Sequence, residues 1–247
     1  MNNVFRIGKV YISITNPKDA EEQITQAALS GINNYICVSN MRTVVLAQKD
    51  QAYLKVMNEA WMCAPDGMPL TWMAHLWGHK NVERTAGPDL LMSMLSKTTS
   101  GVKHFLLGDT EDTLRLIEEK YNSGNIVGSY SPPFCDLGEY DYKHIASLIN
   151  ASGANVVWVS LRAPKQDYFS TMLLPYLDRK VCIGVGAAFR FAIGQYRHPN
   201  KIVQRLGLTG FFLRKNKMRL LVDTVIRSIY LISFSIDILF SRLIGKY

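Results

Sequence analysis

The chain has 247 residues, of which 48% are hydrophobic and 19% are charged. This composition excludes a wholly disordered chain, and the length allows one large domain or one domain with an appendage. The net charge of +8 arises entirely from residue 197 onward, where ten basic residues stand against two acidic ones. A neutral body with a basic, apolar tail differs from the uniformly basic pattern of nucleic-acid-binding domains, so we expect no nucleic-acid partner.

The predicted elements alternate along the chain. Short runs rich in Val, Ile and Leu predict strands at residues 10–14, 35–39, 61–64, 102–107, 125–130, 156–161 and 181–185. Amphipathic segments predict helices at about residues 17–29, 44–46, 53–57, 70–77, 90–95, 111–121 and 140–151, and after the turn at 163–167. Asn16 and Pro17 are expected to open the first helix, Gly31 to close it, and Asp50 to cap the third. This alternation predicts an α/β fold in which helices cover both faces of a mostly parallel sheet.

The cysteines occur singly, mostly inside apolar runs and without a CxxC pair, at Cys37, Cys63, Cys135 and Cys182. This pattern indicates buried thiols in a reducing compartment rather than disulfides or zinc ligands. Residues 1–6 lack the apolar core of a signal peptide, so we expect a cytoplasmic protein. The histidines show no metal-ligand spacing and no Asp-x-Asp motif occurs, so we expect neither a metal ion nor a cofactor.

Turns that follow strands are the candidate ligand-binding positions, because open α/β sheets bind ligands at the carboxyl ends of their strands. These turns contain Asn40, Asp66, Asp109, Tyr130, Arg162 to Gln166, and Gly186. Asp66 follows a predicted strand and precedes a helix whose first turn tolerates Pro69. The nearby helix start favours the ionised carboxylate, which is able to accept a proton; the simpler interpretation is that Asp66 only caps the helix.

Two further segments carry groups suited to polar ligands. Lys165 and Gln166 combine a cation with an amide, a pair able to orient hydroxyls or a diphosphate. The alternative is a solvated helix start with Pro164 at its first position. Arg84 either pairs with Asp89 or faces a ligand, and the spacing does not choose between these roles.

The segment Gly184–Phe189 has a superficial similarity to a dinucleotide-binding fingerprint. Phe189 stands where the third glycine belongs, and the segment follows the last predicted strand rather than the first. It is therefore weak evidence for a nicotinamide-dependent dehydrogenase. Its small residues, including Gly186, still allow the backbone to approach a phosphate or a base closely.

The tail from residue 211 to 247 has no proline and no glycine before Gly245, so a helix is unobstructed. One apolar face is predicted, with arginines lying off it; its members are Leu220, Leu221, Val225, Ile229 and Ile232. The longest charge-free apolar run, 228–236, is too short to span a bilayer, which takes ~20 residues. We expect this helix to lie in the membrane interface with its bases toward anionic lipid. The alternative is an ordinary core helix or the interface of a homo-oligomer.

Several segments occur in one order and together carry a resemblance: VSNMRTVVLA, APDGMPLTW, ERTAGPDLL, HFLLGD, INASGANVVWVSLRAPKQD, IGVGAAFRFAIG and QRLGLTGFF. The chain from about Tyr35 to Phe212 resembles the WecG/TagA/CpsF family of bacterial glycosyltransferases. The resemblance implies a Rossmann-like fold and a metal-independent, inverting transfer of a sugar from a UDP-sugar donor. The sugar implied by the resemblance is N-acetylmannosamine or a related hexose or uronate. The acceptor would be a polyprenyl-diphosphate-linked sugar, in cell-surface polysaccharide biosynthesis at the cytoplasmic face of the membrane.

The resemblance also implies roles for particular residues. Asp66 is the expected general base, and Asn40 is expected to position substrate. Residues 1–196 would form the catalytic domain, and 197–247 a basic amphipathic appendage that reaches the diphosphate and the membrane surface. The full set of expected substrate-binding residues is Asn40, Arg84, Tyr130, Lys165, Gln166, Gly184, Gly186, Arg205, Arg214 and Arg219. The alternative function is a non-catalytic, membrane-docked scaffold of the same fold.

Overall fold

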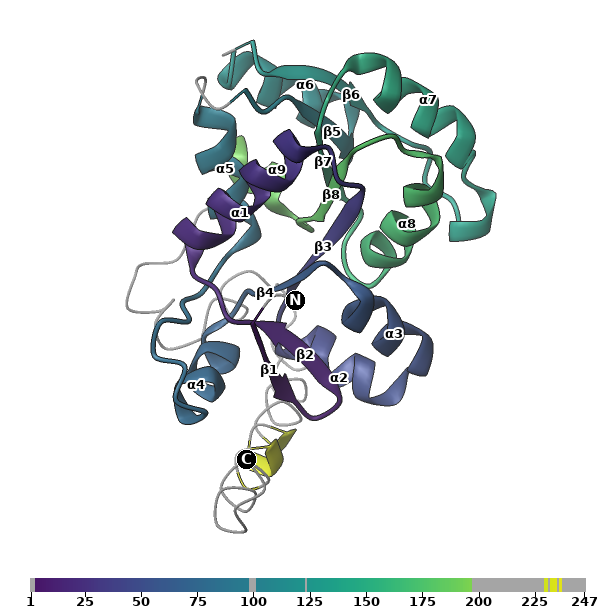
Figure 1. Cartoon of the computed structure of the whole chain (residues 1–247). Helices are drawn as coiled ribbons and strands as arrows, with labels where there is room; N and C mark the ends of the chain where they lie inside the picture. Colours follow the sequence, from purple (N-terminus) through teal and green to yellow (C-terminus); the bar gives the residue numbers. More distant parts are fainter. Residues whose placement is uncertain are drawn as a thin grey trace.

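The computed structural model describes residues 3–97, 101–122, 124–196, 229–230, 232–234 and 236. Its centre is a six-stranded parallel sheet in the order β4-β3-β8-β7-β5-β6, which confirms the predicted α/β fold (Figure 1). The strands are β3 (Asn34–Ser39), β4 (Met62–Pro65), β5 (His104–Gly108), β6 (Ile126–Tyr130), β7 (Val156–Ser160) and β8 (Val181–Gly184). Because all of them run in one direction, their carboxyl ends meet at a single edge of the sheet.

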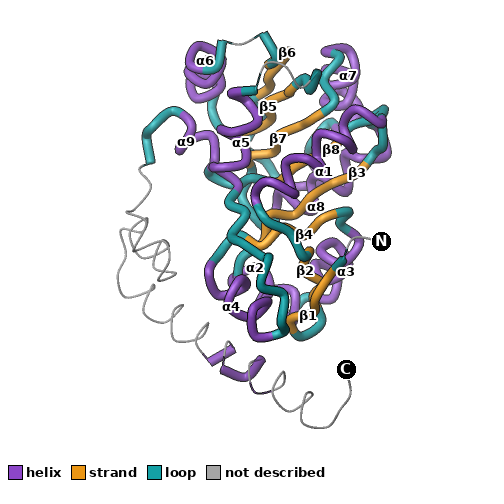
Figure 2. Tube along the Cα trace, turned by 60° about the vertical axis from the view of Figure 1, so that its left-hand side comes forward, coloured by secondary structure: helices purple, strands orange, loops and turns teal. Residues whose placement is uncertain are grey.

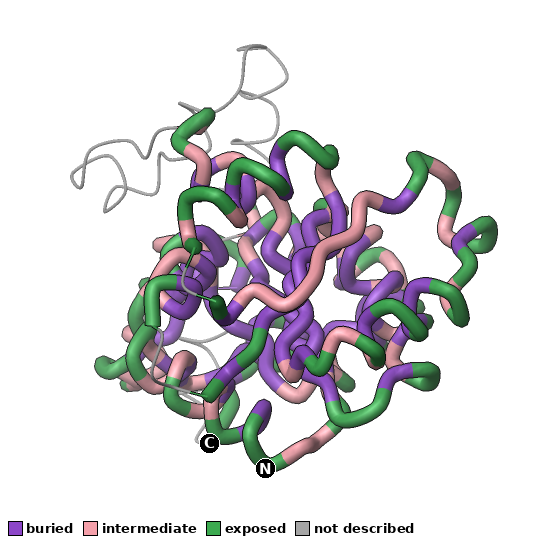
Figure 3. Tube along the Cα trace, turned by 90° about the horizontal axis from the view of Figure 1, so that it is seen from above, coloured by how far each residue is buried: buried purple, intermediate pink, exposed green. Residues whose placement is uncertain are grey.

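Helices cover both faces of this sheet (Figure 2). One face carries α1 (Pro17–Ser30), α5 (Gly87–Ser96), α6 (Glu111–Lys120) and α9 (Ala188–Ala192). The other carries α2 (Met41–Lys49), α3 (Gln51–Glu59), α7 (Tyr142–Ser152) and α8 (Lys165–Leu173). Side chains alternate along β7, so that Trp158 enters the first core while Val157 and Val159 enter the second. The central strands β7 and β8 are therefore buried on both sides. Figure 3 shows the buried residues gathered in the interior of the molecule.

The predicted helix caps are confirmed. Asn16 accepts a hydrogen bond from the Asp19 backbone N–H at 3.0 Å, and Gly31 ends α1 in the left-handed conformation with φ 71°. Asp50 accepts from the backbone of Ala52 at 3.0 Å and so opens α3. Asp50 is also the C-cap of α2, so a single residue separates the two helices that lie between β3 and β4.

Three features of the fold differ from the sequence prediction. A strand β1 (Val4–Ile7) was not predicted; it pairs in antiparallel fashion with β2 (Val10–Ser13) outside the main sheet. This hairpin is attached to α2 by Gln48, whose Oε1 accepts from the Lys9 N–H at 3.0 Å across 39 residues of sequence. The short helix α9 and two 3-10 turns, η1 (Leu137–Glu139) and η2 (Leu174–Tyr176), were also not predicted. Helix α8 begins at Lys165 rather than at Pro164.

Two other helical segments complete the described part. Helix α4 (Met68–Leu76) joins the second core through Leu70 and Met73. Residues 229–230, 232–234 and 236 are helical, and Phe234 in this segment is buried against the second core near Gly8. Lys49 of α2 lies 5.6 Å from the centre of the Tyr230 ring. The rest of the predicted tail helix lies outside the described residues.

Candidate functional site

Asp66 and Asn40 lie side by side at the carboxyl edge of the sheet. Their strands β3 and β4 are neighbours, and Ser39 is in register with Pro65, so the next residue of each strand enters the same rim. The Asp66 backbone N–H donates to the Ser39 carbonyl at 2.6 Å. A Cβ placed on Gly67 would lie 3.8 Å from the Cβ of Asn40. The two predicted turns therefore form one continuous rim.

The Asp66 side chain forms an ion pair rather than a helix cap. Helix α4 has Gly67 at its N-cap and no side-chain cap hydrogen bond. Arg84 Nε instead donates to Asp66 Oδ1 at 3.1 Å, across the loop that precedes α5. The Asp66 side chain is 24% exposed and that of Arg84 is 17% exposed. A carboxylate has about four lone-pair sites, so the contacts with Arg84 and with the Gly87 backbone N–H leave acceptor capacity on this partly exposed side chain.

Burial governs the protonation of Asp66. Burial raises the pKa of the Asp66 carboxyl, and the charge of Asp89 adds to the rise. The Arg84 guanidinium and the Gly87 backbone N–H act in the opposite direction and lower this pKa without cancelling the rise. The helix start was expected to favour the ionised form of Asp66, but the effect of burial on the pKa is larger. Asp66 is a stronger base than an ordinary carboxylate, held in place by a cation.

The turn after β8 rests on Gln166. Its Oε1 accepts the Gly186 backbone N–H at 2.8 Å, and the whole residue is only 2% exposed. A Cβ on Gly184 would approach Gln166 Nε2 to 2.8 Å, so only glycine fits above this amide. Gly186 has φ 61° and open space around its Cβ position, with only Gln166 Oε1 at 3.9 Å. Gln166 therefore supports the turn from below, and Gly186 presents the open surface.

Asp167 lies beneath the same turn and is buried. The Tyr53 hydroxyl donates to its Oδ2 at 2.6 Å. Burial raises the pKa of Asp167 to about 6, against smaller opposing effects of Tyr53, Gln166 and Cys37. Its contacts are all with the interior, so we assign it to the support of the turn.

Tyr130 and Lys165 lie away from Asp66. Tyr130 ends β6, at the opposite margin of the sheet from β4, and five strand spacings separate the two by about 24 Å. The Lys165 ammonium donates to the Cys135 carbonyl and lies 5.0 Å from the centre of the Tyr140 ring. Both residues belong to the carboxyl edge but not to the neighbourhood of Asp66. Arg205, Arg214 and Arg219 lie outside the described residues.

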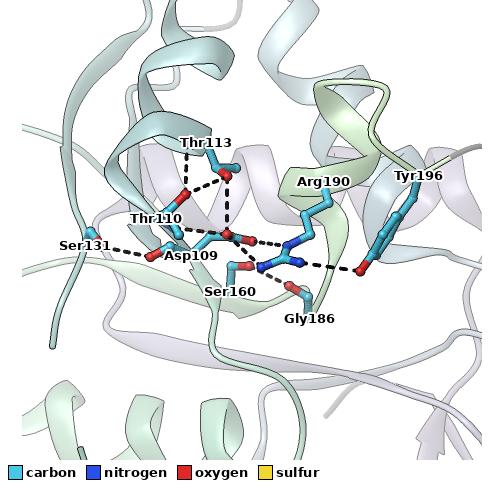
Figure 4. Close-up of polar contacts among 8 residues, drawn as sticks. All are labelled: Asp109, Thr110, Thr113, Ser131, Ser160, Gly186, Arg190 and Tyr196. Atoms are coloured by element: carbon cyan, nitrogen blue, oxygen red, sulfur yellow. Dashed lines mark hydrogen bonds and ion pairs between the residues drawn. The ribbon is translucent and has the colours of Figure 1, made fainter. Parts of the chain in front are cut away.

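The structure adds a polar cluster that we did not predict from the sequence, shown in Figure 4. Asp109, at the end of β5, accepts from Arg190 of α9 at 3.0 Å and 3.3 Å. The Ser160 hydroxyl donates to the Gly186 carbonyl at 2.6 Å beside this pair. The sequence placed Asp109 in a turn after a strand, but its partner is 81 residues away. The one signal in the sequence was that Arg190 is a single charged residue within an apolar segment.

A hollow lies at the other edge of the sheet. A cavity of about 590 Å³ is lined by α1 and by Ile32 and Trp61, which precede β3 and β4, so it opens at the amino ends of these strands. It contains none of the site residues named above. In the described ranges, no three His, Cys, Asp or Glu side chains gather in a way that could hold a metal ion. Within the same ranges, no helix has both the length and the apolar character needed to cross a bilayer.

Two curated bacterial proteins are similar to this chain. Both are named N-acetylglucosaminyldiphosphoundecaprenol N-acetyl-beta-D-mannosaminyltransferase. The protein from Bacillus subtilis (strain 168) is 26% identical over 185 residues, covering 73% of this chain and 71% of its own length. That from Bacillus spizizenii is 26% identical over 183 residues, covering 72% and 69%. A model of the glycosyl transferase WecG/TagA/CpsF family matches residues 5–226, and the chain therefore belongs to this family of glycosyltransferases.

Proposed function

We propose that this protein is an inverting glycosyltransferase that moves a sugar from a UDP-sugar to a polyprenyl-diphosphate-linked saccharide. The sugar would be N-acetylmannosamine or a related hexose or uronate, and the product would serve cell-surface polysaccharide biosynthesis. Membership of the family supports the reaction class. The names of the two Bacillus relatives support the lipid-linked acceptor and the mannosaminyl group.

The observation that carries the proposal is the Asp66–Arg84 pair at the carboxyl edge. A base that activates a hydroxyl needs an accessible oxygen, a fixed direction and a raised pKa. Asp66 combines partial exposure with a pKa that burial raises, and the Arg84 contact at 3.1 Å fixes its orientation. We propose that the transfer is metal-independent and that protein cations, rather than a metal ion, balance the charge of the departing diphosphate.

The proposed reaction is a single displacement. The acceptor hydroxyl attacks the anomeric carbon of the donor, and its proton passes to Asp66. The new bond joins the acceptor oxygen to the anomeric carbon, while the bond from that carbon to the UDP oxygen breaks with its electron pair. The configuration of the anomeric carbon inverts. Asn40, which neighbours Asp66 on the rim, would position the acceptor.

We propose that the donor nucleotide lies along the same edge, toward β8. The open surface of Gly186, next to β3 in the sheet order, would let a phosphate approach the backbone. The tail arginines Arg205, Arg214 and Arg219 are proposed to offset the charge of the departing UDP. We retain the division into a catalytic domain (1–196) and an appendage (197–247) as part of this proposal.

A membrane-bound acceptor requires the protein to reach a bilayer, and the described tail residues suit this role. Phe234 is 8% exposed and packs inward, whereas Ile229, Ile232 and Ile236 are 60%, 61% and 56% exposed. These isoleucines recur at helical spacing and so lie along one outward face. We propose that this face enters the interface of the cytoplasmic leaflet and that basic tail residues bind anionic lipid.

The test is a donor screen with a synthetic prenyl-diphosphate sugar as acceptor. We expect release of UDP and a glycosylated lipid product with at least one UDP-sugar, and loss of both with Asp66→Asn. A protein that is stabilised by membranes but turns over no UDP-sugar would be a scaffold, and stabilisation by NAD instead would indicate a dehydrogenase.

A further inference from the structure

The ion pair between Asp109 and Arg190 bridges two turns at the carboxyl edge. Arg190 Nε lies 3.0 Å from Asp109 Oδ2, and its Nη2 lies 3.3 Å from Oδ1. The Asp109 side chain is only 6% exposed, whereas that of Arg190 is 31% exposed. The carboxylate is therefore enclosed by its partners, and the guanidinium remains partly open to solvent.

Asp109 is itself held firmly. Its Oδ1 accepts the Thr113 hydroxyl at 3.3 Å and the Thr110 N–H at 3.0 Å, and its backbone carbonyl accepts the Ser131 hydroxyl at 2.7 Å. Asp109 also adopts φ 57°, a conformation that is uncommon for a residue with a side chain. Figure 4 shows these contacts gathered on one side of the guanidinium, opposite Tyr196. These contacts fix the position of the carboxylate, which in turn orients the guanidinium of Arg190.

The guanidinium has binding capacity left. An arginine carries five N–H donors in a planar fork. Two of them meet Asp109, and one on Nη1 points to the Tyr196 hydroxyl at 3.5 Å. Among the described residues, the remaining two N–H groups of Arg190 have no acceptor. A pair of donors in this geometry matches the oxygens of a phosphate.

The position of Arg190 relative to Asp66 suits a donor diphosphate. Its guanidinium lies beside Ser160 and Gly186, at the ends of β7 and β8 (Figure 4). Helix α8 after β7 lies on one face of the sheet, while α6 and α9 lie on the other. Such a divergence creates the crevice in which α/β sheets bind ligands. Strand β8, which leads into α9, is two strand spacings, ~10 Å, from β4, and β5, which leads into Asp109, is four spacings, ~19 Å, from it. Arg190 extends from the first of these strand ends to the second, and in the proposed arrangement the diphosphate extends from the anomeric carbon near Asp66 toward it.

We propose that Arg190 binds the diphosphate of the nucleotide donor and that Asp109 is the positioning residue that orients it. The inference rests on the proposed function, and it adds a binding residue from the body of the protein to the arginines of the tail. The chemistry recognised is the oxyanion of a nucleoside diphosphate, not the base or the ribose.

The experiment measures the binding of uridine, UMP and UDP by calorimetry to the full chain and to single variants. Arg190→Ala should weaken UDP binding at least about 10-fold, because a charge-assisted hydrogen bond is lost. Uridine binding should stay within about two-fold, because uridine has no phosphate. Asp109→Asn should weaken UDP binding less, about three-fold, since it frees the guanidinium without removing it.

Two variants serve as controls. Arg115→Ala removes an arginine that is 59% exposed and ion-paired on the outside of α6, and it should leave all three affinities unchanged. Arg190→Lys keeps the charge and the contact with Asp109 but not the fork, so it should fold normally and show an intermediate loss for UDP. It keeps the proposal testable if Arg190→Ala lowers the melting temperature strongly.

Two outcomes would overturn the inference while leaving the proposed function standing. In the first, the parent protein binds UDP and Arg190→Ala binds it equally well. In the second, Arg190→Ala lowers the affinities for uridine and for UDP to the same extent. The ion pair would then only stabilise the packing of α9 against the turn after β5. Failure of the parent protein to bind UDP at all would instead contradict the UDP donor of the proposed function, and with it this inference.

Discussion

Arg84 Nε meets Asp66 Oδ1 at 3.1 Å, joining the loop before α5 to the turn after β4. The contact places a cation against the carboxylate that we propose as the base. The cation also opposes the rise in the pKa of this carboxyl that burial causes. Two predictions concern this pair.

Asp66→Asn should lower turnover of the UDP-sugar by about two orders of magnitude or more, because an amide cannot accept the proton of the attacking hydroxyl. The melting temperature should change by only a few degrees, since the amide is nearly isosteric. Steady-state kinetics and thermal unfolding measure both quantities. Asp112→Asn, at an 87% exposed side chain on α6, is the matched control and should change neither turnover nor the melting temperature. A normal rate in Asp66→Asn would exclude Asp66 as the base.

Arg84→Gln should shift the pH dependence of the reaction. The base must be deprotonated, so the rate falls as the pH falls through the pKa of Asp66. The Arg84 charge lowers this pKa, so its removal should move the acid limb of kcat/KM toward higher pH. Arg84→Lys keeps the positive charge and should therefore show only a small part of this shift. An acid limb that stays in place in Arg84→Gln would separate Arg84 from the protonation of Asp66.

Asp167 should make the folded state less stable as the pH rises. Its pKa is raised to about 6, so between about pH 4 and 6 the folded protein binds a proton that the unfolded chain has released. Stability from this group is therefore greatest at low pH and declines as the pH rises through 6. Asp167→Asn cannot ionise, so relative to the parent it should gain about 1 kcal/mol of stability when the pH is raised from 5 to 7.5, since one pKa unit corresponds to about 1.4 kcal/mol. Urea unfolding at both pH values tests this, and parallel curves would contradict it.

Gly184→Ala should destabilise the fold by about 1–3 kcal/mol, because its methyl group would overlap buried side chains. The new Cβ would lie 2.8 Å from Gln166 Nε2 and 2.9 Å from Asp167 Oδ1. Gly138→Ala is a suitable control, since nothing lies within 4 Å of its Cβ position. Denaturant unfolding compares the two. Equal stability of both variants would mean that the Gln166 amide moves freely.

Replacing Ile229, Ile232 and Ile236 by serine should weaken sedimentation with anionic vesicles at least about 10-fold, since each isoleucine contributes apolar area to the bilayer contact. Raised salt should release part of the parent protein as well. Phe234→Ala is the informative comparison: this side chain is 8% exposed, so its loss should lower stability by about 3 kcal/mol instead. Unchanged vesicle binding of the triple variant would exclude this face as the membrane contact.

Much of the fold could be predicted because its signals are local. Caps at Asn16 and Asp50, the glycine at Gly31 and the apolar runs of the central strands act within a few residues of themselves. The missing elements had no such signal. Strand β1 is stabilised by a partner strand and by Gln48, and α9 has only five residues. The family resemblance could also be recognised from the sequence, because it depends on the identity and order of short motifs and not on their positions in space.

The sequence by itself determined which residues stand in turns after strands, and so which could reach the ligand-binding edge. Only the tertiary structure decided which of them meet, because the strand order β4-β3-β8-β7-β5-β6 does not follow the chain. That order sets Asp66 beside Asn40 and far from Tyr130, and it brings Arg190 to Asp109 across 81 residues. It also buries Gln166 beneath Gly186, whereas the sequence left open whether this amide orients a polar ligand or belongs to a solvated helix start. Burial and charge pairing, which set the pKa of Asp66, exist only once distant segments pack together.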